Sequence, residues 1–208
     1  MCLLQMALNI AVLGSTRGTD LQAVIDAIKN GKLDAKISIV ISNRPGAFIL
    51  ERAKNSGIGT KLIESKGKSR EAFDRELLLE IERHKPDLIL LIGYMRFLSD
   101  AFVQKYRNRI MNIHPSLLPA FAGGMDRNVH QAVLDAKVKE TGCTLHFVDE
   151  TPDNGPIILQ KRVPVAGSDT ADSLKEKVQE AEQEIIVKGL KLFAEGRLKV
   201  EGKSVKIL

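Results

Sequence analysis

The chain has 208 residues, of which 31 are basic and 26 acidic, so its formal net charge is +5 at pH 7. Hydrophobic residues make up 44% and charged residues 27%, which is typical of a globular chain with a sizeable core and excludes disordered or collagen-like proteins. No apolar run reaches the roughly 18 residues that cross a bilayer, so we expect no membrane span.

The excess of positive charge lies near the C-terminus. Residues 185–208 hold six basic and two acidic side chains, a net charge of +4. The chain also has no Trp and two Tyr, so it offers few aromatic platforms on which nucleic-acid bases could stack. We therefore interpret the basic segment as solvated surface and expect no nucleic-acid partner.

The N-terminus and the cysteines indicate the compartment. The first charged residue is Arg17, so the basic start of a secretory signal is missing, and we interpret residues 1–8 as a short extension before the first strand. Cys2 and Cys143 show no metal-ligand spacing, and neither do the histidines and carboxylates. We therefore expect a cytoplasmic protein with free thiols and no metal.

Strands and helices alternate along the first half of the chain. An apolar run at 10–13 leads into a Gly/Ser/Thr loop at 14–19, after which apolar residues recur at helical spacing over 21–28. The order predicts an α/β fold with a doubly wound, mostly parallel sheet and a Rossmann-like N-terminal half. The further predicted elements are strands at 37–41, 60–63 and 88–92, a helix that ends near residue 56, and helices at 69–84 and 99–108.

The pattern changes in the second half, beyond a short strand at 110–113 and the proline-bounded stretch 115–119. We predict a single domain over 1–208, made of two halves at 9–108 and 109–208. The elements predicted after residue 119 are a helix at 129–138, two strands close enough to pair at 144–148 and 157–165, a long amphipathic helix at 170–194, and a closing hairpin within 200–207.

The segment 112–119, Asn-Ile-His-Pro-Ser-Leu-Leu-Pro, carries the most informative polar residues. Residues two apart on a strand face the same way, so Asn112 and His114 present an amide and an imidazole together at the carboxyl end of a strand, where open α/β sheets bind ligands. An amide can stabilise an oxyanion, and an imidazole can transfer a proton near neutral pH. A strand-end histidine that only forms a loop hydrogen bond is the alternative.

A second polar segment, 149–156, is rich in turn-forming residues. It places Asp153 where its carboxylate could reach a neighbouring imidazole, favour the protonated form and fix its orientation. A lone Asp in a turn is most often a turn former, so the hypothesis depends on Asn112, His114 and Asp153 together. We interpret the other histidines as structural or hydrogen-bonded support: His84, His130 and His146.

The loop at 14–19 lies between a buried strand and the start of a helix, where outward-pointing backbone N–H groups suit a phosphate. It lacks the G-x-G-x-x-G spacing of dinucleotide sites, and similar glycine turns also serve to pack a helix on a strand. The loop alone is therefore weak evidence for a ligand.

Three segments occur together and in one order: G-x-M-R-x-L at 93–98, the octapeptide at 112–119, and D-x-x-P-D-N-G-P at 149–156. With them the chain resembles the folate-dependent formyltransferases over about residues 9–199, and among them the phosphoribosylglycinamide formyltransferase family. The resemblance implies a formyltransferase fold, with a nucleotide-binding half at 9–108 and a folate-binding, catalytic half at 109–208. It also implies transfer of a formyl group from 10-formyltetrahydrofolate, as co-substrate, to the amine of glycinamide ribonucleotide in purine biosynthesis.

The resemblance also implies residue roles. The residue that matches Asn112 helps to hold the formyl oxygen as it becomes an oxyanion, the one that matches His114 manages proton transfer, and the one that matches Asp153 favours the protonated imidazole and organises solvent. The positions that match ribonucleotide-binding residues are Gly18, Thr19, Asp20 and Glu182. The positions that match folate-binding residues are Arg70, Met95, Arg96, Phe97, Leu98 and Asn112.

The chain departs from the family pattern at three places. Family members commonly have Asn where this chain has Asp20, and a carboxylate beside a phosphate-holding helix N-terminus costs affinity unless it points away. The loop at 120–127 is longer than the usual form, and Gln183 stands where His is frequent. These departures put substrate contacts in doubt and leave the three candidate catalytic residues untouched.

Two other functions stay open. A formyltetrahydrofolate hydrolase would use water in place of the amine, but that family usually carries an N-terminal regulatory domain, whereas about eight residues precede the first strand of this chain. A nucleotide- or folate-binding module without catalysis is favoured by Asp20 and by the altered loop. The partners that we expect are small-molecule substrates, and we expect a monomer or a homodimer.

Overall fold

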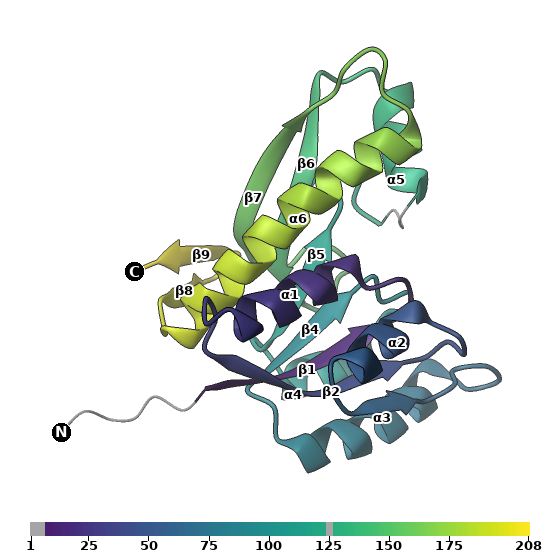
Figure 1. The fold of residues 1–208 in the computed structure, drawn as a ribbon, viewed down its shortest axis with the longest axis vertical. Coiled ribbons are helices and arrows are strands. Elements are labelled where there is room, and N and C mark those ends of the chain that lie inside the picture. The colour runs from purple at the N-terminus through teal and green to yellow at the C-terminus, as the bar shows by residue number, and fades with distance from the viewer. Residues whose placement is uncertain (1–6, 124–126) are drawn as a thin grey trace.

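The computed structural model describes residues 7–123 and 127–208. The strands in these residues are β1 (Leu8–Gly14), β2 (Ala35–Ser42), β3 (Thr60–Leu62), β4 (Leu88–Ile92), β5 (Ile110–His114), β6 (Glu140–Phe147), β7 (Ile157–Pro164), β8 (Leu198–Glu201) and β9 (Ser204–Ile207). The helices are α1 (Thr19–Lys29), α2 (Phe48–Asn55), α3 (Arg70–His84), α4 (Asp100–Lys105), α5 (Arg127–Asp135) and α6 (Ala171–Ala194). One sheet joins the described strands in the order β3-β2-β1-β4-β5-β6-β7-β9-β8 (Figure 1).

The sheet changes from parallel to mixed pairing in its middle. Neighbouring strands from β3 to β5 run parallel, as the alternation of strands and helices predicts. β6 then pairs antiparallel with β5 and with β7, and β8 and β9 form an antiparallel hairpin whose β9 lies parallel to β7. The prediction of a doubly wound, mostly parallel α/β fold is confirmed, as are the pairing of the two later strands and the C-terminal hairpin.

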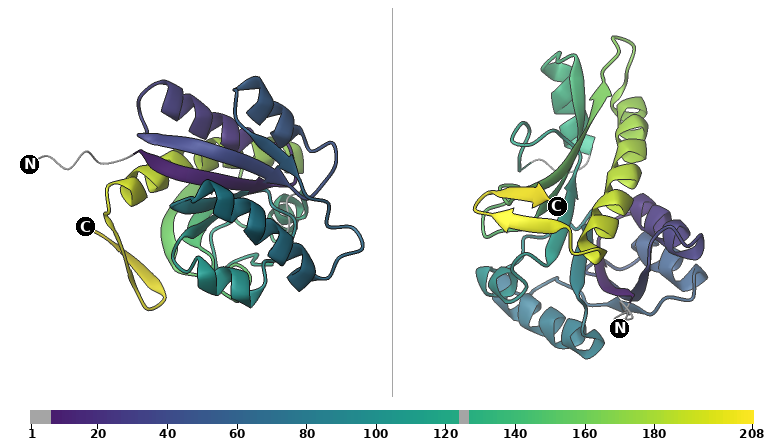
Figure 2. Two further views of the ribbon diagram at one scale, coloured as in Figure 1. Left: turned by 90° about the horizontal axis from the view of Figure 1, so that it is seen from below. Right: turned by 90° about the vertical axis from the view of Figure 1, so that its left-hand side faces the viewer.

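Helices cover both faces of the parallel part of the sheet. In β4, Leu88 and Leu90 pack in a core with α1, α2 and α6, whereas Ile89 and Leu91 pack in a second core with α3 and α4. Figure 2 shows these helical layers on opposite faces of the sheet. Because both faces are covered, β4 is buried along its whole length, which explains its continuously apolar sequence.

Three predicted element ends differ from the observed ones by three residues or more. The helix expected at 99–108 is α4, which ends at Lys105, and Asn108 beyond it has a φ of 58°, a left-handed conformation that an α-helix cannot include. The helix expected at 129–138 is α5, which ends at Asp135 before Lys137, whose φ is 52°. The strand expected from 144 begins at Glu140, where its antiparallel ladder with Pro164 of β7 starts.

The parallel arrangement brings the carboxyl ends of β1, β4 and β5 to one edge of the sheet, so the loops that follow them lie together. Parts of two predicted features lie outside the described residues: residues 1–6 of the extension, with Cys2, and residues 124–126 of the loop at 120–127. In the part of the chain that is described, no helix is both long and apolar enough to span a membrane.

Candidate active site

Two adjoining cavities lie at the carboxyl ends of β1, β4 and β5. The α1 cavity, of about 160 Å³, is lined by the loop at 16–20 that leads into α1, by the end of β4 and by residues of α5 and α6. The β5 cavity, of about 120 Å³, is lined by residues 93–98, by the end of β5 and by the loop between β6 and β7. Gly93, Met95, Ile113 and Pro115 line both cavities, so a ligand in one would lie next to a ligand in the other.

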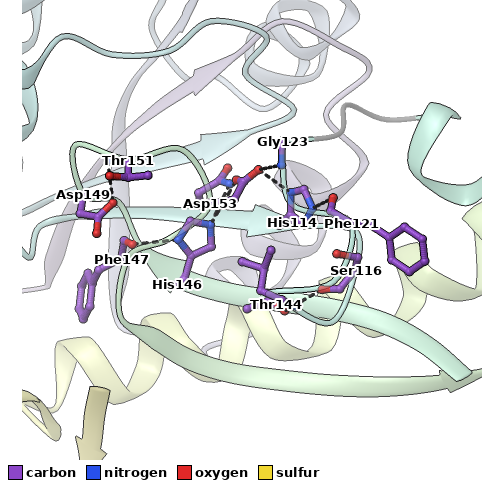
Figure 3. Close-up of polar contacts among 12 residues, drawn as sticks. His114, Ser116, Phe121, Gly123, Thr144, His146, Phe147, Asp149, Thr151 and Asp153 are labelled. Carbon is purple, nitrogen blue, oxygen red and sulfur yellow. Dashed lines mark hydrogen bonds and ion pairs between the residues drawn. The ribbon is translucent and has the colours of Figure 1, made fainter. Parts of the chain in front are cut away.

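β5 presents Asn112 and His114 to the β5 cavity, because side chains two residues apart share a face of the strand. His114 is buried, with its Nε2 3.2 Å from the carbonyl oxygen of Phe121 and its Nδ1 3.4 Å from Oδ2 of Asp153 (Figure 3). Acceptor oxygens therefore face both ring nitrogens of His114.

The loop between β6 and β7 brings Asp153 to the same cavity. Asp153 has a φ of 53°, a left-handed conformation that Asp adopts more readily than most residues, and its Oδ2 accepts a hydrogen bond from the N–H of Gly123 at 2.9 Å. Its carboxylate lies between the rings of His114 and His146 (Figure 3). The structure thus brings Asn112, His114 and Asp153 together, while their catalytic roles stay predictions.

His146 contacts the same cluster from β6. It lies directly opposite Asn112 in the antiparallel ladder, and its Nε2 is 3.1 Å from Nδ2 of Asn112. Its Nδ1 is 2.8 Å from the carbonyl oxygen of Phe147, and burial lowers the pKa of His146. These contacts confirm that His146 is hydrogen-bonded, while no local pattern in the sequence indicates that its partner is Asn112.

The α1 cavity combines a helix N-terminus with two carboxyl groups. Gly18 precedes α1 with a φ of 67°, and a Cβ there would lie 2.5 Å from Cγ1 of Ile49, so the close approach of α2 requires glycine. Thr19 begins the helix, whose unpaired N–H groups and positive dipole end favour an anion. Asp20 and Glu182 also line this cavity, so the structure brings together all four residues predicted to bind the ribonucleotide.

Asp20 is one of the residues that line the α1 cavity. The residue is 6% exposed, and its Oδ1 is buried with no hydrogen-bond partner among the described residues. Burial raises the pKa of Asp20 to about 7, because the buried carboxyl group loses the solvation that stabilises its charged form. The carboxyl group therefore keeps its proton up to about neutral pH.

The segment that follows β4 lines the β5 cavity with the predicted folate-binding residues Met95, Arg96, Phe97 and Leu98. The N–H of Met95 donates a hydrogen bond of 2.8 Å to Oγ of Ser15, which ties this segment to the end of β1. The guanidinium group of Arg96 lies 4.7 Å from the centre of the Phe73 ring, a cation–π contact that fixes its position.

Arg70 is the predicted folate-binding residue that the structure does not bring to a cavity. It is the first residue of α3, its side chain is half exposed, and it pairs with Glu71 at 3.4 Å. Among the described residues that line the two cavities, Arg70 is absent. A role for Arg70 would therefore concern a part of a ligand that extends beyond the cavity.

Sequence reasoning missed two residues of α6 that line the α1 cavity. Lys175 and Gln179 line it together with Glu182. Their positions, four and three residues apart along α6, place them on one face of this helix. That helical spacing relative to Glu182 is the signal that could have found them.

The described residues hold no cluster suited to a metal ion, since no three His, Cys, Asp or Glu side chains among them gather in a suitable way. Cys143 is a free, buried thiol in this part of the chain. Burial, and then the charge of Glu182, raise the pKa of the Cys143 thiol, so it stays protonated and unreactive.

Comparisons with known proteins agree over most of the chain. The profile of the formyl transferase family matches residues 8–190. The phosphoribosylglycinamide formyltransferase of Escherichia coli (strain K12) is 46% identical over 194 residues, which cover 93% of this chain and 90% of that protein. The trifunctional purine biosynthetic protein adenosine-3 of Bos taurus is 45% identical over 193 residues, which cover 92% of this chain and 19% of that protein.

Solved structures give the same result. Glycinamide ribonucleotide transformylase 1 from Symbiobacterium toebii superposes with a TM-score of 0.94 at 41% identity, covering 99% of this chain and 96% of that chain. A formyltetrahydrofolate deformylase from Pseudomonas syringae pv. tomato superposes with a TM-score of 0.89 at 25% identity, covering 97% of this chain and 66% of that chain. The deformylase is thus similar in fold and more distant in sequence.

Proposed function

The chain belongs to the formyl transferase family, and from that premise we propose that it transfers the formyl group of 10-formyltetrahydrofolate to the amine of glycinamide ribonucleotide, a step of purine biosynthesis. The observation that carries the proposal is the meeting of Asn112, His114 and Asp153 in the β5 cavity, beside the residues that this cavity shares with the α1 cavity. A transferase needs this arrangement, because the formyl donor and the acceptor amine must occupy neighbouring sites with the catalytic groups between them.

In the reaction, the amine nitrogen forms a bond to the formyl carbon, the bond between that carbon and N10 of the folate breaks, and one proton passes from the amine to N10. The formyl oxygen carries negative charge in the tetrahedral intermediate. An N–H of Asn112 can donate a hydrogen bond to that oxygen, and a protonated His114 would add a positive charge beside it. His114 is also the group that can carry the proton between the two nitrogens.

Asp153 would act on His114. Its Oδ2 lies 3.4 Å from Nδ1 of the ring, close enough to fix the ring plane. The hydrogen bond from the N–H of Gly123 holds this carboxylate oxygen in place. We assign Asp153 to positioning and charge balance rather than to contact with the formyl group.

The α1 cavity fits the ribonucleotide. The N-terminus of α1, with Gly18 and Thr19, suits the phosphate, and the carboxyl groups of Asp20 and Glu182 suit ribose hydroxyl groups, which can donate hydrogen bonds to them. The amine would then reach the shared wall of the two cavities, where the formyl carbon must lie.

The β5 cavity fits the folate, which supplies the formyl group when it is bound. Leu91, Leu98 and Val148 give this cavity apolar walls that suit a flat heteroaromatic ring, and Arg96 lies among the lining residues with its charge available to an acidic group. Both cavities are lined by residues before and after position 109. The assignment of the nucleotide to the half 9–108 and of the folate to the half 109–208 stays a prediction.

An assay of tetrahydrofolate release separates the transferase from its rivals. The protein is incubated with 10-formyltetrahydrofolate, with and without glycinamide ribonucleotide. Release that requires the ribonucleotide is the expected result. Equal release without it would indicate a formyltetrahydrofolate hydrolase, and binding of both ligands without release would indicate a module without catalysis.

The same assay tests the catalytic residues. We expect His114→Ala to lower turnover by about 10²- to 10⁴-fold, because it removes the group that moves the proton. Asp153→Ala should also lower turnover by orders of magnitude while the urea midpoint shows that the fold is kept. His84→Ala, at the far end of α3, is the matched control and should leave turnover unchanged. Turnover like that of the wild type in either cavity variant would refute the proposed roles.

The setting of this reaction is part of the proposal. We infer a cytoplasmic enzyme, which is supported by the free thiol of Cys143. We also infer small-molecule partners alone, with no nucleic-acid partner, and a monomer or a homodimer. Sedimentation of the purified protein would distinguish the two assembly states.

A further inference from the structure

The amide of Asn112 has a partner that no catalytic role accounts for. On β6, His146 lies opposite Asn112 in the ladder, is 1% exposed, and brings its Nε2 to 3.1 Å from Nδ2 of Asn112. A buried, polar ring in a strand that otherwise faces the core needs hydrogen-bond partners for both of its nitrogens. The two nitrogens of His146 have such partners, and each partner restricts where the ring protons lie.

The hydrogen-bond partner of Nδ1 determines whether this nitrogen carries a proton. Nδ1 lies 2.8 Å from the carbonyl oxygen of Phe147, and because a carbonyl oxygen accepts hydrogen bonds and never donates them, Nδ1 must carry a proton. The carboxylate that faces the other nitrogen is too distant for a hydrogen bond, since Oδ1 of Asp153 is 3.8 Å from Nε2. Nε2 therefore interacts with Asn112.

The burial of His146 determines whether Nε2 carries a proton as well. The buried position of His146 lowers its pKa, against the opposing effects of the Phe147 carbonyl and of the carboxylates of Asp153 and Asp149, while His114 lowers it further. The ring is then neutral, and Nε2 has a lone pair that can accept a hydrogen bond. Nδ2 of Asn112 donates this hydrogen bond to Nε2 of His146.

We propose that His146 is a positioning residue for the transfer reaction, because its Nε2 accepts one N–H of Asn112 and thereby aims the other N–H of the same amide at the formyl oxygen. The inference rests on the proposed function, in which Asn112 stabilises the oxyanion. Without this acceptor the amide could rotate and present its own oxygen to the developing negative charge, which would repel it. The chain thus fixes the orientation of the catalytic amide through a histidine on the neighbouring strand.

NMR of a ¹⁵N-histidine-labelled protein tests the hydrogen bond directly. The two ring nitrogens of His146 should give different ¹⁵N shifts, with Nδ1 protonated and Nε2 unprotonated. In Asn112→Ala the Nε2 signal should shift, because its donor is gone, while the Nδ1 signal stays. A protonated Nε2 in the wild type, or no change in Asn112→Ala, would overturn the proposal whatever the activity of the protein.

A double-mutant cycle tests the consequence. His146→Leu removes the acceptor and should lower kcat about tenfold or more, within the 10²- to 10³-fold or so that loss of one oxyanion donor costs, with the KM of both substrates little changed. His146→Gln keeps an acceptor oxygen near the position of Nε2 and should recover most of the lost kcat. In an Asn112→Ala background, His146→Leu should cause little further loss.

The outcomes separate the proposal from simpler explanations. Equal losses for His146→Leu with and without Asn112 would show that His146 acts independently of the amide and would overturn the proposal. Equal losses for the Leu and Gln variants would also overturn it, because packing rather than hydrogen bonding would then explain the effect. A wild-type protein without transferase activity would refute the proposed function, and the NMR experiment would still decide whether the hydrogen bond exists.

Discussion

Asp20 is the residue at which this chain departs most sharply from what a phosphate-holding loop requires. A carboxylate at the start of α1 would repel a phosphate, yet Asp20 lines the cavity and is buried. Burial reduces this repulsion, because it raises the pKa of Asp20 to about 7 and keeps the carboxyl group neutral over much of the acidic range. A protonated carboxyl group resembles the Asn amide of the family in shape and in its capacity to donate a hydrogen bond.

The raised pKa of Asp20 predicts a pH dependence of stability. Below about pH 4 the group is protonated in both the folded and unfolded chains. Between the unfolded value near 3.8 and the folded value near 7, the folded chain keeps a proton that the unfolded chain has lost, so this group destabilises the fold progressively as pH rises. The loss levels off above pH 7 at on the order of 4 kcal/mol.

Urea unfolding of Asp20→Asn between pH 4 and pH 8 checks this prediction. The variant cannot ionise, so its advantage over the wild type should be small at pH 4 and should grow to its full value near pH 7.5. Asp26→Asn, which changes an exposed carboxylate on the same helix, is the matched control and should leave the pH dependence as in the wild type. A stability difference between Asp20→Asn and the wild type that does not change with pH would contradict the prediction.

At the scale of elements, the loop between β6 and β7 decides where Asp153 points. Gly155 follows Asp153 closely, and a Cβ at this position would lie 1.9 Å from the carbonyl oxygen of Phe147 in β6. The backbone of the loop thus packs directly against the strand. The register of β6 with β5 therefore bears on the position of the Asp153 carboxylate as well as on that of His146.

Gly155→Ala should displace this loop. The added methyl group must push the backbone away from β6, which we expect to destabilise the protein by about 1–3 kcal/mol. The shift of Asp153 should lower kcat by at least about tenfold, because misplacement of a catalytic group by about 1 Å can cost 10²-fold. Steady-state kinetics and urea unfolding measure the two effects.

Gly167→Ala is the control for this experiment, because a Cβ there would meet no atom within 4 Å. Its kcat and its stability should match those of the wild type to within the effect of an ordinary surface substitution. If Gly155→Ala kept the wild-type kcat, the position of Asp153 would not depend on the contact with β6, and this account of the loop would be wrong.

The elements differ in how far the sequence predicts them. The parallel strands and their helices follow from local apolar periodicity, because each strand is buried on both faces and each helix on one. The ends of α4 and α5 depend on Asn108 and Lys137, which have a left-handed conformation. The residue types Asn and Lys do not predict that conformation as glycine does. Side chains two residues apart share a face of a strand, so the sequence also predicts that Asn112 and His114 lie together at the end of β5.

The rest of the site depends on contacts between distant residues. His146 reaches Asn112 across a ladder whose register no local pattern specifies, and the two residues are 34 positions apart. Asp20 and Glu182 come from opposite ends of the chain and meet because α1 and α6 pack on the same face of the sheet. The sequence indicates the chemical groups, and the packing of the sheet decides which of them act together.

For the whole molecule, the two cavities belong to one site. Each takes residues from both halves of the chain, and four residues line both. Such a site can hold two substrates in contact and exclude water from the formyl group that is transferred, whereas a hydrolase would have to admit water. We therefore propose that the formyl carbon passes directly from the folate to the ribonucleotide.

Following a ¹³C-labelled formyl group by NMR tests this claim most directly. The labelled 10-formyltetrahydrofolate is mixed with the wild-type protein and glycinamide ribonucleotide, and the carbon signal is observed over time. We predict that the label leaves the folate and appears as a formamide on the ribonucleotide, with no free formate. A label that appears as formate, or that stays on the folate, would contradict the account.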